Sequence, residues 1–305
     1  MQYHDNTVYV IAGPTASGKT NIAIRLAQSL GTDIISADSR QCYKEMNIGT
    51  AKPSEKELQA VRHYFINEFS VSQDITAADF ERLSLGYLHE IFQQNKNAIV
   101  CGGTGLYINA LCNGLDEMPV VDSKISKEVN EQFEAKGLEW LQESITIHDP
   151  GYITGGEMQN PARIIRALVF KLSTGKSILD FRTGTRKNRA FNIIKVGLDI
   201  PREILYARIN DRVDSMMKAG LLEEARGLFH NRRLKNLQTV GYSKLFDHLD
   251  GKYSIYEAVE KIKQHTRNYA KRQLTWFKKD REIHWVPADD KDILANILAL
   301  KKVQL

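Results

Sequence analysis

The 305-residue chain contains only three cysteines, Cys42, Cys101 and Cys112. None belongs to a Cys-x-x-Cys pair and none has the spacing of a zinc site, which excludes a disulfide framework and a zinc-binding module. Long hydrophobic runs are also missing, because no stretch approaches the roughly 18 apolar residues that a membrane span requires. The first residues lack the charged and then apolar segments of a secretory signal. We therefore expect a soluble, cytoplasmic protein without a membrane partner.

Charge is unevenly distributed along the chain. The formal net charge is only +5, yet residues 202–281 hold 18 basic and 10 acidic residues. Between positions 261 and 281, eight cations occur beside a single acid, Asp280. This composition is more typical of a helix that contacts a phosphate backbone than of an ordinary solvated face, so it favours a polyanionic partner. In the same segment Ile262, Tyr269 and Trp276 recur every seven residues, which predicts a stripe buried in the core.

Residues 13–20 form a glycine-rich segment with the sequence GPTASGKT. Two glycines four residues apart, followed by Lys-Thr, have the spacing of a phosphate-binding P-loop. An apolar run at 8–12 predicts a strand before it, and apolar residues at helical spacing follow it from Ile22. In that context backbone N–H groups surround an anion at a helix N-terminus. Lys19 would reach the outer phosphate and Thr20 would ligate Mg²⁺, but the loop alone does not specify whose phosphates it holds.

Asp38 follows a second predicted strand, the β-branched run at 33–37. Ligands of open α/β sheets lie at the carboxyl ends of the strands, so Asp38 can face the same crevice as the P-loop. Taken alone, Asp38 is better explained as the N-cap of a helix. A third strand at 97–101 leads into a second glycine-rich turn, and it ends in Cys-Gly rather than in the Mg²⁺-associated Asp of ATPases and GTPases. That ending counts against ordinary nucleotide hydrolysis.

The composition changes near residue 119, where amphipathic helical stripes replace the strand-helix alternation. We interpret residues 119–190 as a small all-helical insertion domain. Residues 1–118 and 191–305 are interpreted as an α/β core, a P-loop NTPase-like parallel sheet with a C-terminal helical region. The basic loop at 182–189 has no apolar anchor, so we expect it to face solvent or nucleic acid.

Seven segments, in this order, resemble those of the bacterial tRNA dimethylallyltransferases, also called tRNA isopentenyltransferases. They are the P-loop, ISADSRQ at 35–41, IGTAKP at 48–53, GGTGLY at 102–107, RIIRAL at 163–168, VGY at 240–242 and AKRQLTW at 270–276. The resemblance runs nearly end to end, and the combination is far more specific than the P-loop alone. Arg62-His63-Tyr64 departs from a frequent Pro-His-His, but this departure does not touch the residues assigned to the chemistry.

The resemblance implies transfer of a dimethylallyl group from dimethylallyl diphosphate to N6 of adenosine 37, beside the tRNA anticodon. It implies Mg²⁺ as the ion, tRNA held between core and insertion, and a diphosphate rather than ATP in the P-loop. The implied catalytic residues are Asp38 as general base, with Thr20 and Arg212 at the leaving group. The diphosphate would be held by Gly13, Thr15, Ala16, Ser17, Gly18, Lys19, Thr20, Arg208 and Arg212. The tRNA would be contacted by Asp38, Ser39, Arg40, Gln41, Thr104, Arg163, Arg166, Lys271 and Arg272. We expect a monomer.

Other interpretations stay open from the residues alone. Arg208 and Arg212, four apart on one helix face, are equally explained by ion pairs with Glu203 or Asp211. A small-molecule P-loop kinase would use ATP under an arginine-bearing lid, which the insertion would supply. The missing strand-end Asp and the basic last helix argue against that kinase. A non-enzymatic RNA-binding protein would leave Asp38 and the loop of Thr104 without a role.

Overall fold

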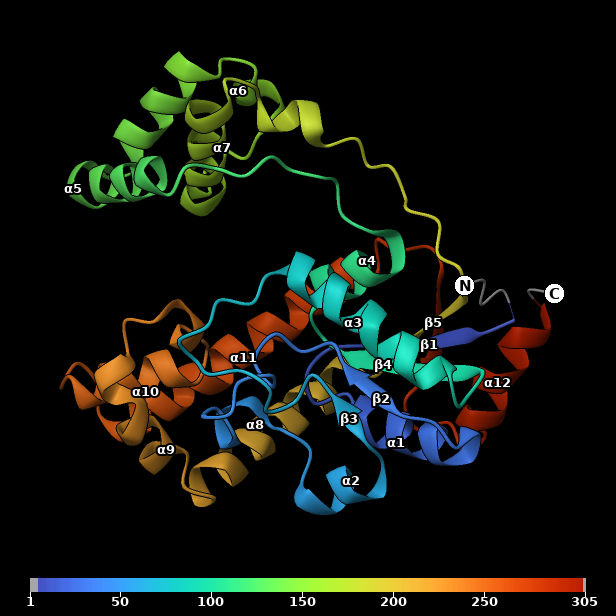
Figure 1. Ribbon diagram of the computed structural model, residues 1–305. Coiled ribbons are helices and arrows are strands. Elements are labelled where there is room, and N and C mark those ends of the chain that lie inside the picture. The colour runs from blue at the N-terminus through green and yellow to red at the C-terminus, as the bar shows by residue number, and fades with distance from the viewer. Residues whose placement is uncertain (1–4, 304–305) are drawn as a thin grey trace. The chain divides into compact units, whose positions relative to one another are not determined.

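The computed structural model describes residues 5–303, and these divide into two compact units (Figure 1). One unit runs up to Asn113 and resumes at Asn188, and the other comprises Gly114–Lys187. The helical unit therefore begins a few residues before the predicted position 119 and ends a few before 190. Met118, directly before the predicted boundary, packs against the core of the helical unit.

The first unit is built on a six-stranded sheet in the order β3-β2-β4-β1-β5-β6, and every pair of neighbouring strands is parallel. Its strands are β1 (Thr7–Ala12), β2 (Ile34–Ser36), β3 (His63–Tyr64), β4 (Asn97–Gly102), β5 (Asn192–Asp199) and β6 (Ile283–Pro287). All six residues of β1 are buried, as expected for a central parallel strand covered on both faces. The two-residue strand β3 was not predicted.

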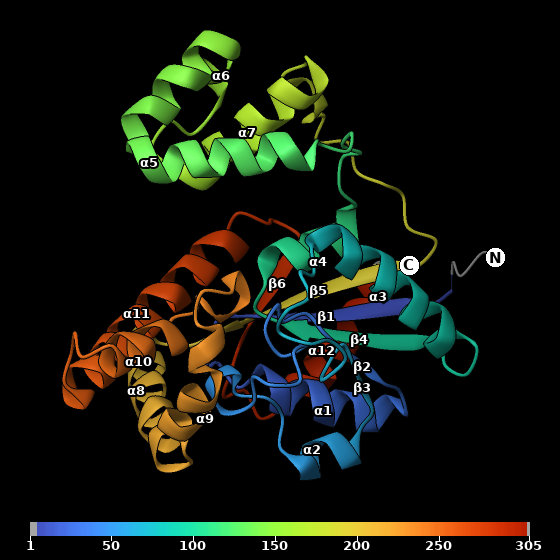
Figure 2. The same cartoon turned by 60° about the vertical axis from the view of Figure 1, so that its left-hand side comes forward.

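Alternate residues of β1 face two separate hydrophobic layers. Val8 and Val10 pack with α3 (Ala77–Phe92) and α4 (Gly105–Asn113). Tyr9 and Ile11 pack with α1 (Lys19–Leu30) and α12 (Ile293–Val303). Figure 2 shows α3 and α4 above the sheet and α1 below it. The strand period of two thus places helices on both faces and leaves the carboxyl ends of the strands open for a site.

Further helices of the first unit gather at that open end (Figure 2). The remaining helices of this unit are α2 (Glu55–Ala60), α8 (Arg202–Lys218), α9 (Leu221–Leu228), α10 (Tyr242–Leu249) and α11 (Ile255–Phe277). Along α11, Ile262 is buried as predicted, but Tyr269 and Trp276 are 36% and 45% exposed. The predicted core stripe is therefore wrong for these two residues. Tyr269 borders a cavity, and the Trp276 ring covers Gly105, so neither reaches the sheet.

The second unit consists of three helices, α5 (Ser123–His148), α6 (Tyr152–Gly155) and α7 (Pro161–Thr174), with a short 3₁₀ turn. Gly137 interrupts α5 with φ 78° and ψ −166°, a conformation that suits glycine and kinks the helix. Pro161 occupies the first turn of α7, and Gly175 ends it with φ 72°. The unit buries its own core, which includes Leu141 and Leu168.

The structure also describes the cysteines and the apolar character of the helices. All three cysteines are free and buried. Among the helices of residues 5–303, none combines the length and the apolar character needed to cross a bilayer.

Arg189 binds to the end of α4 at the point where the chain re-enters the first unit after the insertion. Its guanidinium donates to the carbonyl oxygens of Ala110 and Leu111 at the end of α4 and to the Glu81 carboxylate at 2.7 Å. The two side chains of this ion pair are only 10% and 11% exposed. The loop prediction for 182–189 is therefore wrong for Arg189, because its cation satisfies helix-end carbonyls that would otherwise lack donors.

Replacing Arg189 by Ala is expected to destabilise the first unit by about 3 kcal/mol, because a buried carboxylate and two buried carbonyls lose their donor. Urea-induced unfolding measures the change. Arg182→Ala, in the exposed part of the same loop, is the matched control and should stay within about 0.5 kcal/mol of the parent chain. Equal effects of the two substitutions would show that the Arg189 ion pair contributes nothing.

Candidate functional site

A cavity of about 650 Å³ opens at the carboxyl ends of β2 and β4, beside the P-loop. Its wall contains most of the residues assigned from the sequence. These are Thr15, Ala16, Gly18, Lys19, Thr20, Asp38, Ser39, Arg40, Gln41, Arg212 and Arg272. Gly13, Ser17, Thr104, Arg208 and Lys271 belong to the same unit but not to the wall, and Arg163 and Arg166 lie in the other unit. The fold thus joins segments more than 200 residues apart around one cavity.

One buried hydroxyl of the P-loop has no hydrogen-bond partner among the described residues. Ala16 (φ 65°) and Gly18 (φ 91°) adopt left-handed conformations that turn the chain from β1 into α1. The Ser17 hydroxyl is buried and has no hydrogen-bond partner among the described residues. The Lys19 ammonium folds back and donates to the Pro14 carbonyl at 3.0 Å. A buried hydroxyl without a partner beside a helix N-terminus indicates a site built for an anion.

Two cations meet at this loop. Arg212 of α8 donates to the Thr15 hydroxyl at 3.3 Å. Burial lowers the pKa of both Lys19 and Arg212, and the charge of Arg212 lowers the pKa of Lys19 further, while Asp38 opposes these shifts. An anion bound between Lys19 and Arg212 would offset the free-energy cost of burying each of these positive charges. Arg208 is exposed, and its guanidinium lies about 4.0 Å from the point where a Cβ on Gly18 would stand.

Asp38 lines the same cavity as the P-loop. Its Oδ1 accepts from the backbone N–H groups of Arg40 (2.9 Å) and Gln41 (3.3 Å). Its Oδ2 has no hydrogen-bond partner among the described residues. The N-cap interpretation is wrong, because residues 39–42 form a turn and no helix begins at Asp38; Oδ1 instead closes this turn, and Oδ2 is left for the functional role. The hydrogen bonds of the turn fix the rotamer, and the second oxygen is left to accept a proton from a ligand.

Thr104 holds the Asp38 segment from the neighbouring loop. Its hydroxyl accepts from the Ser39 N–H at 3.1 Å, and its own N–H donates to the Ala37 carbonyl at 3.1 Å. A Cβ on Gly102 would stand 2.1 Å from that carbonyl, so only glycine permits this approach. Thr104 thus lies behind the cavity wall rather than in it.

Gln273 is a site residue that sequence reasoning did not assign. Its buried amide accepts from the Thr15 N–H at 2.9 Å and donates to the Gly103 carbonyl at 2.8 Å, so α11 ties the P-loop to the second glycine-rich turn. A Cβ on Gly103 would stand 2.3 Å from the Gln273 amide nitrogen. The sequence feature that could have indicated a role for Gln273 is its position in the segment 270–276, next to Arg272.

Asn236 is a second residue that was missed. Its buried side chain accepts from Arg40 at 3.0 Å and donates to the carbonyls of Val71 and Gln73. It therefore orients the guanidinium that follows Asp38. Nothing in the local sequence pattern marks this contact, because its partners lie more than 160 positions away.

Cations without carboxylate partners lie on α11. Lys271 and Arg272 are both exposed, and neither forms an ion pair within the described residues. Arg272 borders the cavity, whereas Lys271 lies outside it. This arrangement continues the positive charge of the cavity onto the surface, as a partner rich in phosphate requires.

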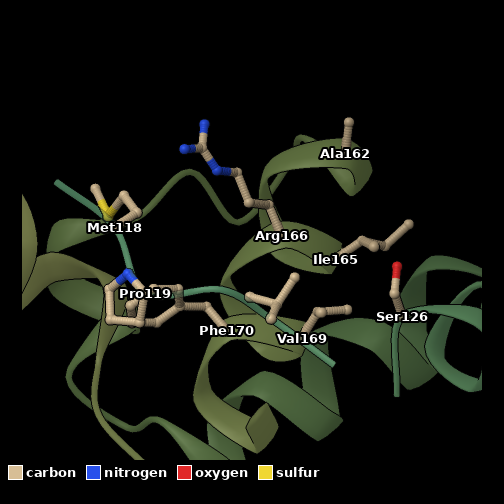
Figure 3. A pocket seen from close by; sticks show the side chains of 9 residues that line it. Met118, Pro119, Ser126, Ala162, Ile165, Arg166, Val169 and Phe170 are labelled. Carbon is tan, nitrogen blue, oxygen red and sulfur yellow. The ribbon is translucent and has the colours of Figure 1, made fainter. Parts of the chain in front are cut away.

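The helical unit has its own pocket of about 370 Å³, lined by residues of α7, of the segment before α5 and of the first turn of α5 (Figure 3). Arg166 extends its guanidinium from α7 at this pocket, exposed and without an ion pair, whereas exposed Arg163 pairs with Glu157. Residues 157–187 hold seven basic and two acidic residues, whereas α5 holds three basic and five acidic ones. The net charge is therefore positive over residues 157–187, which include α7, and negative over α5.

Comparisons with known proteins give one consistent result. The model of the family "IPP transferase" matches residues 41–280. The tRNA dimethylallyltransferase of Christiangramia forsetii is 45% identical over 285 residues, which cover 93% of this chain and 94% of that protein. The tRNA dimethylallyltransferase 1 of Bacteroides thetaiotaomicron is 42% identical over 289 residues, which cover 94% of each.

Solved structures agree with these relatives. The full-length tRNA isopentenylpyrophosphate transferase of Bacillus halodurans is 33% identical, with a TM-score of 0.71, and the match covers 98% of this chain and 95% of that one. A eukaryotic dimethylallyltransferase acting on tRNA is 26% identical, with a TM-score of 0.75, and the match covers 98% of this chain and 78% of that one.

Proposed function

Since this chain belongs to the IPP transferase family, we propose that it transfers a dimethylallyl group from dimethylallyl diphosphate to N6 of adenosine 37 in tRNA. The products are N6-(dimethylallyl)adenosine in the tRNA and free diphosphate. We propose further that the enzyme acts as a monomer in the cytoplasm, with the insertion contacting the tRNA.

One observation carries this proposal. A single cavity is lined by the P-loop, by two half-buried cations and by Asp38, whose Oδ2 has no hydrogen-bond partner among the described residues. An anion bound by Lys19 and Arg212 would thus lie within the same enclosure as a proton acceptor. That pairing suits the displacement of a diphosphate by a nucleophile that must lose a proton.

The chemistry assigns each group one task. The N6 lone pair of adenine attacks C1 of the dimethylallyl group, the bond from C1 to the diphosphate oxygen breaks, and both electrons leave with diphosphate. Asp38 Oδ2 accepts the N6 proton as the new bond forms. Lys19, Arg212 and the P-loop amides stabilise the negative charge that develops on the leaving group. To reach this cavity the base must leave its stack, which costs less in a single-stranded loop.

Mg²⁺ fits the donors that the cavity offers. The Thr20 hydroxyl provides one hard oxygen, and the described residues contain no cluster of three metal-ligating side chains. Mg²⁺ commonly takes most of its ligands from phosphate oxygens and water, so a single protein oxygen is compatible with its binding beside a diphosphate. When bound, the ion would neutralise part of the leaving group's charge.

Incubation with radiolabelled dimethylallyl diphosphate and unmodified tRNA tests the proposal. We expect label in the tRNA at adenosine 37, and we expect EDTA to remove the activity and Mg²⁺ to restore it. A tRNA that stays unlabelled under these conditions would overturn the proposal. ATP-dependent phosphorylation of a small molecule would instead identify a kinase.

A further inference from the structure

Glu224 of α9 reaches across to a 3₁₀ turn (Ile48–Thr50) that forms part of the cavity wall. Its carboxylate accepts from three successive backbone N–H groups. The distances are 3.0 Å to Asn47, 2.8 Å to Ile48 and 2.9 Å to Gly49. Hydrogen bonds to an ionised carboxylate are about twice as strong as neutral ones, so one side chain fixes the start of this turn.

Tyr242 completes the arrangement from α10. Its hydroxyl donates to the same carboxylate at 2.5 Å, and its side chain is fully buried. Burial and the Glu224 charge raise the pKa of Tyr242, so the hydroxyl remains a donor at any working pH. A Cβ on Gly49 would stand 2.6 Å from the tyrosine ring, so the turn lies directly on this ring.

The far end of the turn is bonded to the Asp38 segment. The Gln41 amide donates to the carbonyls of Thr50 (3.2 Å) and Ala51 (3.1 Å), and the Gln41 N–H donates to Asp38 Oδ1. Ala51 is held at φ 50°, a left-handed conformation that is costly for alanine and persists only where the surroundings impose it. A continuous hydrogen-bond network therefore runs from Tyr242 and Glu224 through the turn and Gln41 to Asp38.

We propose that Glu224 and Tyr242 are positioning residues for the nucleoside side of the cavity. They hold the 3₁₀ turn at 48–50, and through Gln41 they hold the carboxylate of Asp38 in register with the bound base. Among the described residues, no hydrogen bond joins the P-loop or Arg212 directly to Glu224, Tyr242 or the turn. The P-loop reaches the Asp38 segment by a separate route, through Gln273 and the loop of Thr104. This inference rests on the proposed function and adds residues that neither touch substrate nor border the reacting atoms.

Glu224→Gln tests the inference because it removes the charge and presents an NH₂ group to a backbone donor. We expect kcat/KM for tRNA to fall about 10²-fold, as for other small misplacements of a site. KM for dimethylallyl diphosphate should stay within about twofold, because the network does not bind the diphosphate.

Tyr242→Phe removes only the hydroxyl and should cost about tenfold in kcat/KM for tRNA. Glu223→Gln, the exposed neighbour, is the matched control and should leave both substrates unaffected.

Hydrogen exchange supplies a readout that does not need activity. In Glu224→Gln the amides of residues 47–49 should exchange faster, while those of the P-loop keep their wild-type rates. Unchanged kcat/KM for tRNA, or a KM for dimethylallyl diphosphate that rises as much as kcat/KM for tRNA falls, overturns the inference. If Glu224→Gln does not fold, Tyr242→Phe decides it by the same criteria. A wild-type chain that transfers no label overturns the proposed function instead, and the exchange experiment still tests the network.

Discussion

Replacing Asp38 by asparagine is expected to slow the transfer step about 10²- to 10⁴-fold, the range that a positioned general base contributes. The asparagine oxygen can still accept from the N–H groups of Arg40 and Gln41, so the turn should keep its shape. What is lost is the free carboxylate oxygen that takes the N6 proton. Single-turnover rates at saturating concentrations of both substrates measure the effect.

Two comparisons separate chemistry from structure at this position. Binding of tRNA to Asp38→Asn, measured by filter retention, should match that of the parent chain. Asp38→Ala also loses the two hydrogen bonds that Oδ1 accepts within the turn, each worth about 1 kcal/mol, so its melting temperature should fall while its rate resembles that of Asp38→Asn. A rate for Asp38→Asn within tenfold of wild type would remove Asp38 from the role of base.

The second large effect is expected at the diphosphate. Arg212→Ala should lower kcat/KM for dimethylallyl diphosphate about 10²- to 10³-fold, as loss of one preorganised donor to a developing anion does. The reason is its position, since Arg212 lies half-buried in the cavity wall and contacts the Thr15 hydroxyl of the P-loop. Arg212→Lys keeps the charge but loses the planar fork, so its loss should be intermediate. Initial rates at varied diphosphate substrate give these values.

Arg208→Ala is the natural control because Arg208 lies one turn away on the same helix. Its guanidinium is near Gly18 but outside the cavity wall, so we expect a loss below about tenfold. The reverse ranking of the two arginines would transfer the leaving-group role to Arg208.

Local patterns in the sequence sufficed for the elements that make the cavity's framework. The strand at 8–12, the helix that follows the P-loop and the strand at 97–101 lie where the sequence pattern predicted them. Such patterns work because burial on one face of a helix or strand repeats at a fixed period. β3 escaped detection because two residues carry no period, and its pairing with β2 is what defines it.

The parts of the site that were missed share a different cause. Gln273 bonds to Thr15, and Glu224 bonds to the turn at 48–50, across more than 170 positions of the chain. Contacts of this length depend on the packed arrangement of several elements, which no window of the sequence contains. At Trp276 the predicted helix is correct, but the predicted burial in the core is not. The side chain packs over Gly105 instead, a contact that helical periodicity does not contain.

The division of the chain into two bodies, each with its own buried core, determines how its stability can be measured. The three tryptophans are divided between them: Trp140 packs on the core of the helical unit, whereas Trp276 and Trp285 belong to the α/β unit. Where two bodies unfold separately, one transition temperature does not describe the chain. Fluorescence from Trp140 alone would follow the insertion, and fluorescence from the other two would follow the catalytic core. A denaturation curve from all three mixes the bodies, so variants such as Arg189→Ala are best compared in a chain where Trp140 is replaced by Phe.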